Sequence, residues 1–289
     1  MTADLETLVV AAYYFASLLP VAARRRGRGP KLSDAELIAL AVAQAVMGIC
    51  SDRHFLGLVR FRLPGWFPRL LEQSQYNRRL RALTPQLVWV QQQLSELLAV
   101  GPLRLADGTL VGVANYPGCA QKSAFAGLAA YGFCPSKSEW VWGVRLVLLV
   151  DRKGVPVGYT LVPANEKEYE PVRELALGDG STILVCDKGL WGRQYAETLQ
   201  LEGTLLHTPD RVRTADNLDR ERSLASLRLV VESTIANLKC QMRLEQHLAK
   251  TPAGLLQRIA QRLLALTLGI FINALTGRPP RALVAYDGR

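Results

Sequence analysis

The chain has 289 residues, enough to bury a large core in one domain or in two smaller ones. Its 49% hydrophobic and 21% charged residues are typical of a folded soluble protein. The net charge of +10 favours an acidic partner, either nucleic acid or an anionic membrane surface.

Other features argue against export, membrane insertion and zinc binding. The longest nearly unbroken apolar run, residues 263–275, is too short to cross a bilayer. The N-terminus carries acids where a signal peptide would be basic. The five scattered cysteines form no C-x-x-C pair, and the three histidines are far apart. We therefore expect a cytoplasmic protein with reduced thiols and no membrane contact.

The first hundred residues carry helical patterns without a strand signal. An apolar pattern over residues 4–19 stops at Pro20, and Ser33 and Glu36 have the spacing of a capping box before the next apolar run. A further helix is predicted from Thr84, with Pro85 at its first position. Residues 1–100 are therefore predicted to form an all-helical N-terminal domain.

Two basic segments in this region are candidates for DNA contact. Arg24, Arg25 and Arg26 belong to "RRRGRGPK", which is either an arm that follows phosphates or a minor groove, or a solvated linker. Arg78 and Arg79 belong to "YNRRLR", which is either the recognition helix of a helix-turn-helix-like unit or a solvent-facing basic helix. For the second segment we favour DNA binding.

From residue 101 the pattern changes to strands alternating with helices. A short apolar run ends at Asp107, and residues 139–162 form two β-rich runs joined by a turn at Asp151–Gly154. A helix near 166–177, a buried strand ending at Asp187, a helix, a short strand and a last helix follow. This order predicts a mixed α/β sheet with flanking helices over residues 101–289.

Three acids stand out in this part of the chain. Asp107 and Asp187 are predicted at strand ends, and Glu232 lies on the helix after the last strand. Side chains at such strand ends converge at one edge of an open α/β sheet. Three carboxylates suit Mg²⁺ or Mn²⁺, and two such ions can stabilise both oxygens of a phosphodiester displacement. Taken singly, each aspartate also fits a turn residue and Glu232 a simple ion pair.

The helix around Glu232 carries two cations near this acid. Arg228 precedes Glu232 by four residues and Lys239 follows it by seven. In a regular α-helix all three fall within about 40° of one line along the helix. Asn165 and Glu168 are further candidates at the edge of the site, although Asn165 also fits a cap at the start of a helix.

These residues resemble the signatures of bacterial insertion-sequence transposases of the DDE class. Arg228, Glu232 and Lys239 match the R, E and K of the Y-(2)-R-(3)-E-(6)-K signature, with Ala225 at the tyrosine position. Asp187 lies in "DKGLWG", which is similar to a D-x-G-[FYW] box in which Leu190 replaces the aromatic residue. Asp107 lies in "LADGTL", which resembles the first-strand box, with Gly108 departing from it.

The resemblance implies a DNA-binding domain at residues 1–100, followed by an RNase H-like catalytic domain at residues 101–289. By this resemblance, Asp107, Asp187 and Glu232 hold two Mg²⁺ ions, with Mn²⁺ as an alternative. Arg228 and Lys239 hold DNA phosphates, and Lys188 is a further candidate for DNA contact. The implied activity is metal-dependent cleavage and strand transfer at terminal inverted repeats, by a homodimer on DNA.

Two other functions stay open. The departures at Ala225, Gly108 and Leu190 would suit a catalytically inactive DNA-binding derivative of a transposase. The same acids would also serve an RNase H-like nuclease without strand transfer.

Overall fold

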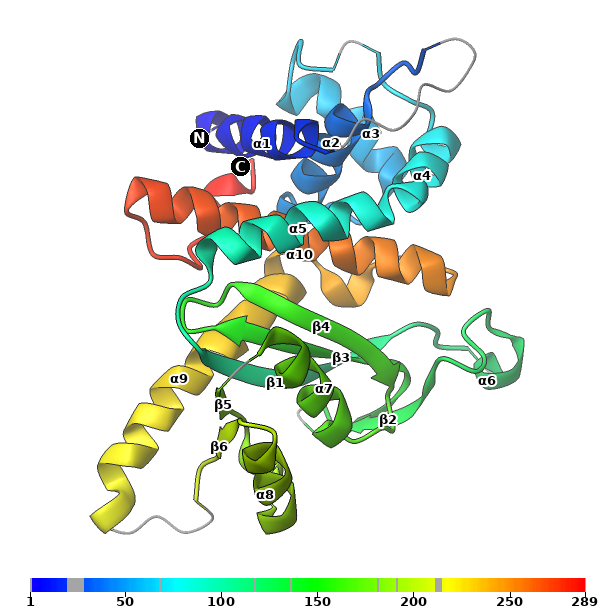
Figure 1. Cartoon of the computed structure of the whole chain (residues 1–289). Coiled ribbons are helices and arrows are strands. Elements are labelled where there is room, and N and C mark those ends of the chain that lie inside the picture. Colours follow the sequence, from blue (N-terminus) through cyan, green and yellow to red (C-terminus); the bar gives the residue numbers. More distant parts are fainter. Residues whose placement is uncertain are drawn as a thin grey trace. The chain divides into compact units, whose positions relative to one another are not determined.

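The computed structural model describes residues 2–19, 29–67, 69–116, 118–135, 137–180, 182–190, 192–210 and 215–288. The chain divides into two compact units (Figure 1), which are Met1–Leu97 with Asn237–Arg289 (unit 1) and Leu98–Ala236 (unit 2). The predicted domain ranges differ from these units at the C-terminal end. The reason is that the last long helix packs among the N-terminal helices of unit 1.

Unit 1 is helical in its described parts. Its helices are α1 (Thr2–Ser17), α2 (Asp34–Val46), α3 (Asp52–Arg62), α4 (Gln73–Ala82), most of α5 (Thr84–Leu98), and α10 (Pro252–Thr276). The predicted capping box at the start of α2 is confirmed, because the Glu36 amide donates to the Ser33 hydroxyl at 3.1 Å. The helix α10 is long and apolar enough to cross a membrane, but most of it is buried within unit 1, as in a core helix.

Unit 2 is built on a mixed sheet. Its strands are β1 (Leu103–Gly112), β2 (Ala130–Cys134), β3 (Glu139–Asp151), β4 (Pro156–Pro163), β5 (Ile183–Val185) and β6 (Leu205–His207). The order is β2-β3-β1-β5-β6, with β4 also paired to β3. The strand β1 runs antiparallel to β3 and parallel to β5, and β5 runs parallel to β6. This confirms the predicted RNase H-like mixed sheet, whereas β2 and the short helix α6 (Cys119–Lys122) were not predicted.

The predicted turn between β3 and β4 is present and is fixed by a buried acid. Asp151 accepts backbone hydrogen bonds from Lys153 at 2.8 Å and Val155 at 2.9 Å. Gly154 has a φ of +89°, which a residue with a side chain rarely adopts. The turn therefore sets the pairing of the longest strand with β4.

Helices cover both faces of the sheet. On one face, α7 (Tyr169–Asp179) and α8 (Arg193–Leu201) enclose a core with residues of the central strands (Figure 1). The long helix α9 (Leu218–Ala236) packs against β1 and β5. The core under α7 and α8 consists of Ala106, Val147, Leu149, Val172, Ala176, Leu184, Cys186, Leu190 and Leu199.

Candidate active site

Asp107 and Asp187 lie at matching positions relative to two neighbouring parallel strands, with Asp107 inside β1 and Asp187 two residues beyond the end of β5. The last parallel pair between β1 and β5 joins Leu105 with Val185, and each aspartate follows its strand's member of that pair by two residues. The prediction that Asp107 ends its strand is wrong, because β1 continues to Gly112 through antiparallel pairing with β3. Asp107 nevertheless lies just past the end of the parallel pairing. Side chains of neighbouring strands converge at this edge of an open α/β sheet.

Both aspartates point to the face of the sheet that α9 covers. The residue before each of them, Ala106 or Cys186, is buried in the core under α7 and α8. Side chains of consecutive strand residues point to opposite faces. The strand pattern therefore directs Asp107 toward α9, and the ion pair of Asp187 with Arg228 of α9 places Asp187 on the same side.

The turn that follows Asp187 is anchored from both sides. The Asp187 carboxylate accepts the Lys188 backbone N–H at 2.7 Å, and the side chain of Leu190 is buried in the core. The Tyr169 hydroxyl at the start of α7 donates to the Gly189 carbonyl at 2.9 Å. Leu190, which departs from the aromatic residue of the signature, thus fills the core position of this turn.

Glu232 is linked to Asp187 through one guanidinium nitrogen. Arg228 Nη2 lies 2.9 Å from Asp187 Oδ1 and 3.3 Å from Glu232 Oε1. The α9 helix thereby brings the third acid to the same side of the sheet as Asp187. The prediction that Glu232 lies on the helix after the last strand is confirmed.

Asp107 is in an electrostatically unfavourable position for a carboxylate. Burial raises its pKa most, and the negative charges of Glu168 and Asp187 raise it further. The backbone N–H of Gly108 and the charge of Arg228 act in the opposite direction, and the resulting pKa is about 6. The site therefore concentrates negative charge around a partly buried carboxyl group.

Glu168, a candidate for the edge of the site, is a fourth acid near Asp107. Its carboxylate forms an ion pair with Arg145 of β3. A Cβ atom added at Gly108 would lie 2.5 Å from Glu168 Oε1. The glycine that departs from the family pattern therefore leaves room for this acid. Arg145 is thus held by Glu168.

In the described part of the chain, no three Asp, Glu, His or Cys side chains are already spaced to share a metal ion. The position of Arg228 gives a physical reason, because this cation lies between the carboxylates of Asp187 and Glu232. An arginine in this place offsets charge that a divalent ion would otherwise offset.

Lys239 does not continue the regular α-helix that the angular prediction assumed. The α9 helix ends at Ala236, and Lys239 lies in a following π-helix, Asn237–Gln241, where it ion-pairs with Glu245 at 3.2 Å. A π-helix has more residues per turn than an α-helix, so the 3.6-residue projection fails there. Its role in DNA binding stays a prediction, as does that of Lys188, whose side chain is exposed.

The basic residues predicted to contact DNA in unit 1 differ in whether other groups of the protein already bind them. Arg79 on α4 is held by Asp34 at 2.6 Å and by the Leu32 carbonyl at 2.8 Å, whereas Arg78 is exposed. Arg24, Arg25 and Arg26 lie outside the described residues. DNA contact by all of these residues stays a prediction.

The strand order of this mixed sheet is RNase H-like, with acids on or just beyond two adjacent strands and on the helix that follows the last strand. The chain belongs to the family described as "Transposase DDE domain", whose sequence profile matches residues 99–268. Members of this family generally use divalent metal ions. The chain is therefore a transposase by family.

Solved transposase structures also resemble the chain. A synaptic complex of piggyBac transposase with hairpin DNA has 12% sequence identity and a TM-score of 0.49, covering 99% of this chain and 77% of that chain. The Mos1 transposase paired-end complex with the left transposon end has 12% identity and a TM-score of 0.24, covering 80% and 84%. No curated protein sequence matches the chain with significant similarity.

Proposed function

We propose that this transposase cuts DNA at the terminal inverted repeats of its own insertion sequence and joins the ends to target DNA. The observation that carries the proposal is the arrangement of three acids. Asp107 and Asp187 each lie two residues past the last parallel pair between adjacent strands, and Arg228 links Asp187 to Glu232. Acids on different elements, directed to one side of one sheet, are the arrangement that metal-dependent phosphodiester chemistry requires.

Asp107, Asp187 and Glu232 would hold the metal ions. Their oxygen atoms are the ligands that Mg²⁺ and Mn²⁺ prefer. Burial raises the pKa of Asp107 most, and the negative charges of Glu168 and Asp187 raise it further; a divalent cation would offset those charges, which supports this fit. When bound, two Mg²⁺ ions would stabilise the attacking and leaving oxygens of the phosphodiester.

The chain's own cations would position the DNA. Arg228 can exchange its two carboxylate partners for a phosphate, which its planar guanidinium binds through two parallel hydrogen bonds. Lys188 is exposed directly beside Asp187 and would add a point charge near the scissile phosphate. Lys239 would bind a DNA phosphate once its ion pair with Glu245 is broken.

The reaction would proceed in two displacements at phosphorus. A water oxygen first bonds to the phosphorus at the element's end, and the bond to the 3′ oxygen breaks to release a 3′-hydroxyl. This hydroxyl then attacks a target phosphodiester, so that a new strand junction forms and a target 3′-hydroxyl leaves. Because two ends are joined in one event, the active form would be a homodimer on DNA.

The test uses the DNA that flanks the gene as substrate for the full-length protein with Mg²⁺. Asp187→Asn and Glu232→Gln should each abolish nicking and joining. Asp219→Asn, an exposed acid at the start of α9, is the matched control and should leave both unchanged. Undiminished cleavage by Asp187→Asn or Glu232→Gln would refute the proposal. Cleavage without joining by the wild type would instead indicate a nuclease, and DNA binding without cleavage an inactive derivative.

A further inference from the structure

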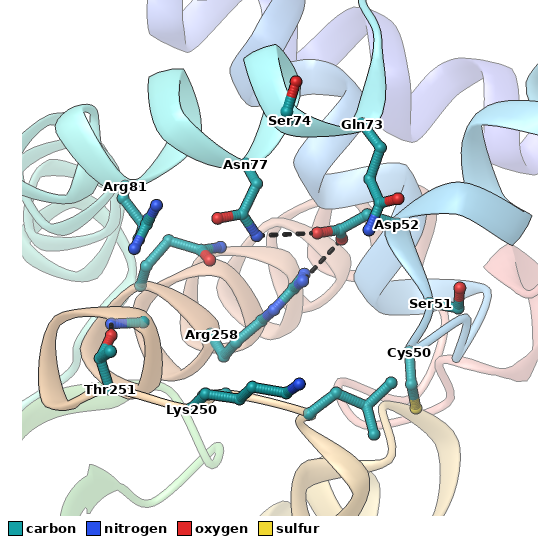
Figure 2. Close-up of a pocket in the computed structure, with 14 residues that line it drawn as sticks. Cys50, Ser51, Asp52, Gln73, Ser74, Asn77, Arg81, Lys250, Thr251 and Arg258 are labelled. Atoms are coloured by element: carbon teal, nitrogen blue, oxygen red, sulfur yellow. Dashed lines mark hydrogen bonds and ion pairs between the residues drawn. The ribbon is translucent and has the colours of Figure 1, made fainter. Parts of the chain in front are cut away.

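Unit 1 contains a polar pocket that lies between its N-terminal and C-terminal segments. Its volume is about 620 Å³, and residues from α3, α4, α10 and the segment before α10 line it (Figure 2). This volume falls within the range of roughly 300–1,000 Å³ that is usual for small-ligand pockets. The pocket therefore has room for a sugar-phosphate unit.

The inner part of the pocket is a closed polar network. Figure 2 shows Asp52 bound by both Asn77 and Arg258, at 3.0 and 2.6 Å. Gln44 donates to the same carboxylate at 2.8 Å. The Asp52 and Arg258 side chains are only 4% and 8% exposed, so this ion pair is almost fully desolvated.

Asp52 is therefore ionised, and Arg258 already balances its negative charge. Burial by itself would raise its pKa, but the charge of Arg258 and the hydrogen bonds from Arg258, Gln44 and Asn77 outweigh burial and hold the pKa below its ordinary value. The negative charge of Asp52 is offset by Arg258, which leaves little of it to repel an anion in the pocket.

Two further cations give the pocket its net positive charge. Arg81 comes from α4 and Lys250 from the segment before α10, and both line the pocket with exposed side chains (Figure 2). Across the residues that the structure describes, neither side chain has a carboxylate within ion-pair distance. Ser74 and Gln73 add polar groups at the same pocket.

We propose that this pocket binds the phosphate backbone of DNA, with Arg81 and Lys250 as its phosphate contacts. Two unmatched cations beside a neutralised ion pair select for an anion, and the surrounding hydroxyl and amide groups suit a sugar-phosphate chain. Arg81 belongs to the helix that carries Arg78, one of the predicted DNA contacts. The inference rests on the proposal that the chain acts on DNA, and it adds a specific site of attachment.

The test measures binding of the full-length protein to a mixed-sequence DNA duplex over a range of salt concentrations. Each phosphate contact contributes about 0.9 to the slope of log affinity against log salt, which is about eightfold in affinity at 0.1 M salt relative to 1 M. Arg81→Gln and Lys250→Gln should each weaken binding about eightfold at 0.1 M salt and reduce the slope by about 0.9. Arg60→Gln removes the same charge from an exposed position of α3 outside the pocket, and it should have a smaller effect.

Cys50 provides a second readout, because it lines the pocket and is half-buried. The duplex should slow alkylation of Cys50 by N-ethylmaleimide, and the Arg81→Gln/Lys250→Gln double variant should lose this protection. Protection by thymidine monophosphate without protection by the duplex would overturn the proposal in favour of a mononucleotide site.

The remaining outcomes separate this inference from the proposed function. Pocket variants that bind like the wild type, or an equal loss in Arg60→Gln, would overturn the pocket assignment even if the protein cuts DNA. Binding that depends on Arg81 and Lys250 without cleavage would leave the pocket assignment intact and refute the catalytic proposal. A wild-type protein that does not bind the duplex would refute both.

Discussion

Replacing Asp107 with Asn should stabilise the metal-free protein at neutral and alkaline pH. The pKa of Asp107 rises from 3.8 to about 6 in the folded chain, which corresponds to about 3 kcal/mol of penalty for the ionised form. A raised carboxyl pKa means that the folded state binds this proton more tightly than the unfolded state. The penalty is therefore absent well below pH 3.8, develops as the pH rises and is complete above about pH 6.

Urea unfolding in EDTA at pH 5 and pH 8 measures this effect. By linkage, about half of the penalty is already present at pH 5, so the stability gain of Asp107→Asn should grow by about 1.4 kcal/mol between the two pH values. Asn keeps an oxygen that can accept the Gly108 N–H, so the local backbone contact is retained. At pH 8, Mg²⁺ should stabilise the wild type more than the variant. An equal pH dependence in both proteins, or equal stabilisation by Mg²⁺, would refute the reasoning.

Three further substitutions test the surroundings of the acids. Gly108→Ala should destabilise the protein in urea by about 1–3 kcal/mol through the clash with Glu168, and Glu168→Ala in the same chain should restore most of the loss; no rescue would contradict the clash. Arg228→Gln should lower the thermal midpoint in EDTA, by less than about 1 kcal/mol in stability because the pair is partly exposed, and Mg²⁺ should reverse the loss; a midpoint equal to the wild type would contradict this. Tyr169→Phe removes the hydrogen bond to Gly189 and should cost about 1 kcal/mol in urea unfolding, and an unchanged midpoint would show that the turn does not depend on it.

Much of the catalytic fold could be predicted because its signals are local. Buried apolar runs mark the central strands, and the side chain of Asp151 fixes the turn at Asp151–Gly154. The strand β2 was not predicted, because only one of its five residues is buried and the segment therefore has no run of buried apolar residues. It forms through antiparallel pairing with β3, which is a contact that the local sequence does not show. The grouping of α10 with the N-terminal helices likewise depends on contacts distant in sequence.

The candidate site was predictable in its acids but not in its electrostatics. The order and spacing of Asp107, Asp187 and Glu232 follow from strand and helix patterns. The link through Arg228 to Asp187 requires two elements to meet, which spacing along one helix cannot show. The packing of Glu168 against Gly108 is tertiary for the same reason.

The central claim is that Asp107, Asp187 and Glu232 together hold divalent metal ions on DNA. Its most direct test is to count Mn²⁺ bound to the full-length protein in complex with uncleavable end DNA, by electron paramagnetic resonance. The account predicts two ions per chain in the wild type and in Asp219→Asn, with binding lost or reduced in Asp107→Asn, Asp187→Asn and Glu232→Gln. Unchanged Mn²⁺ binding in all three active-site variants would contradict it.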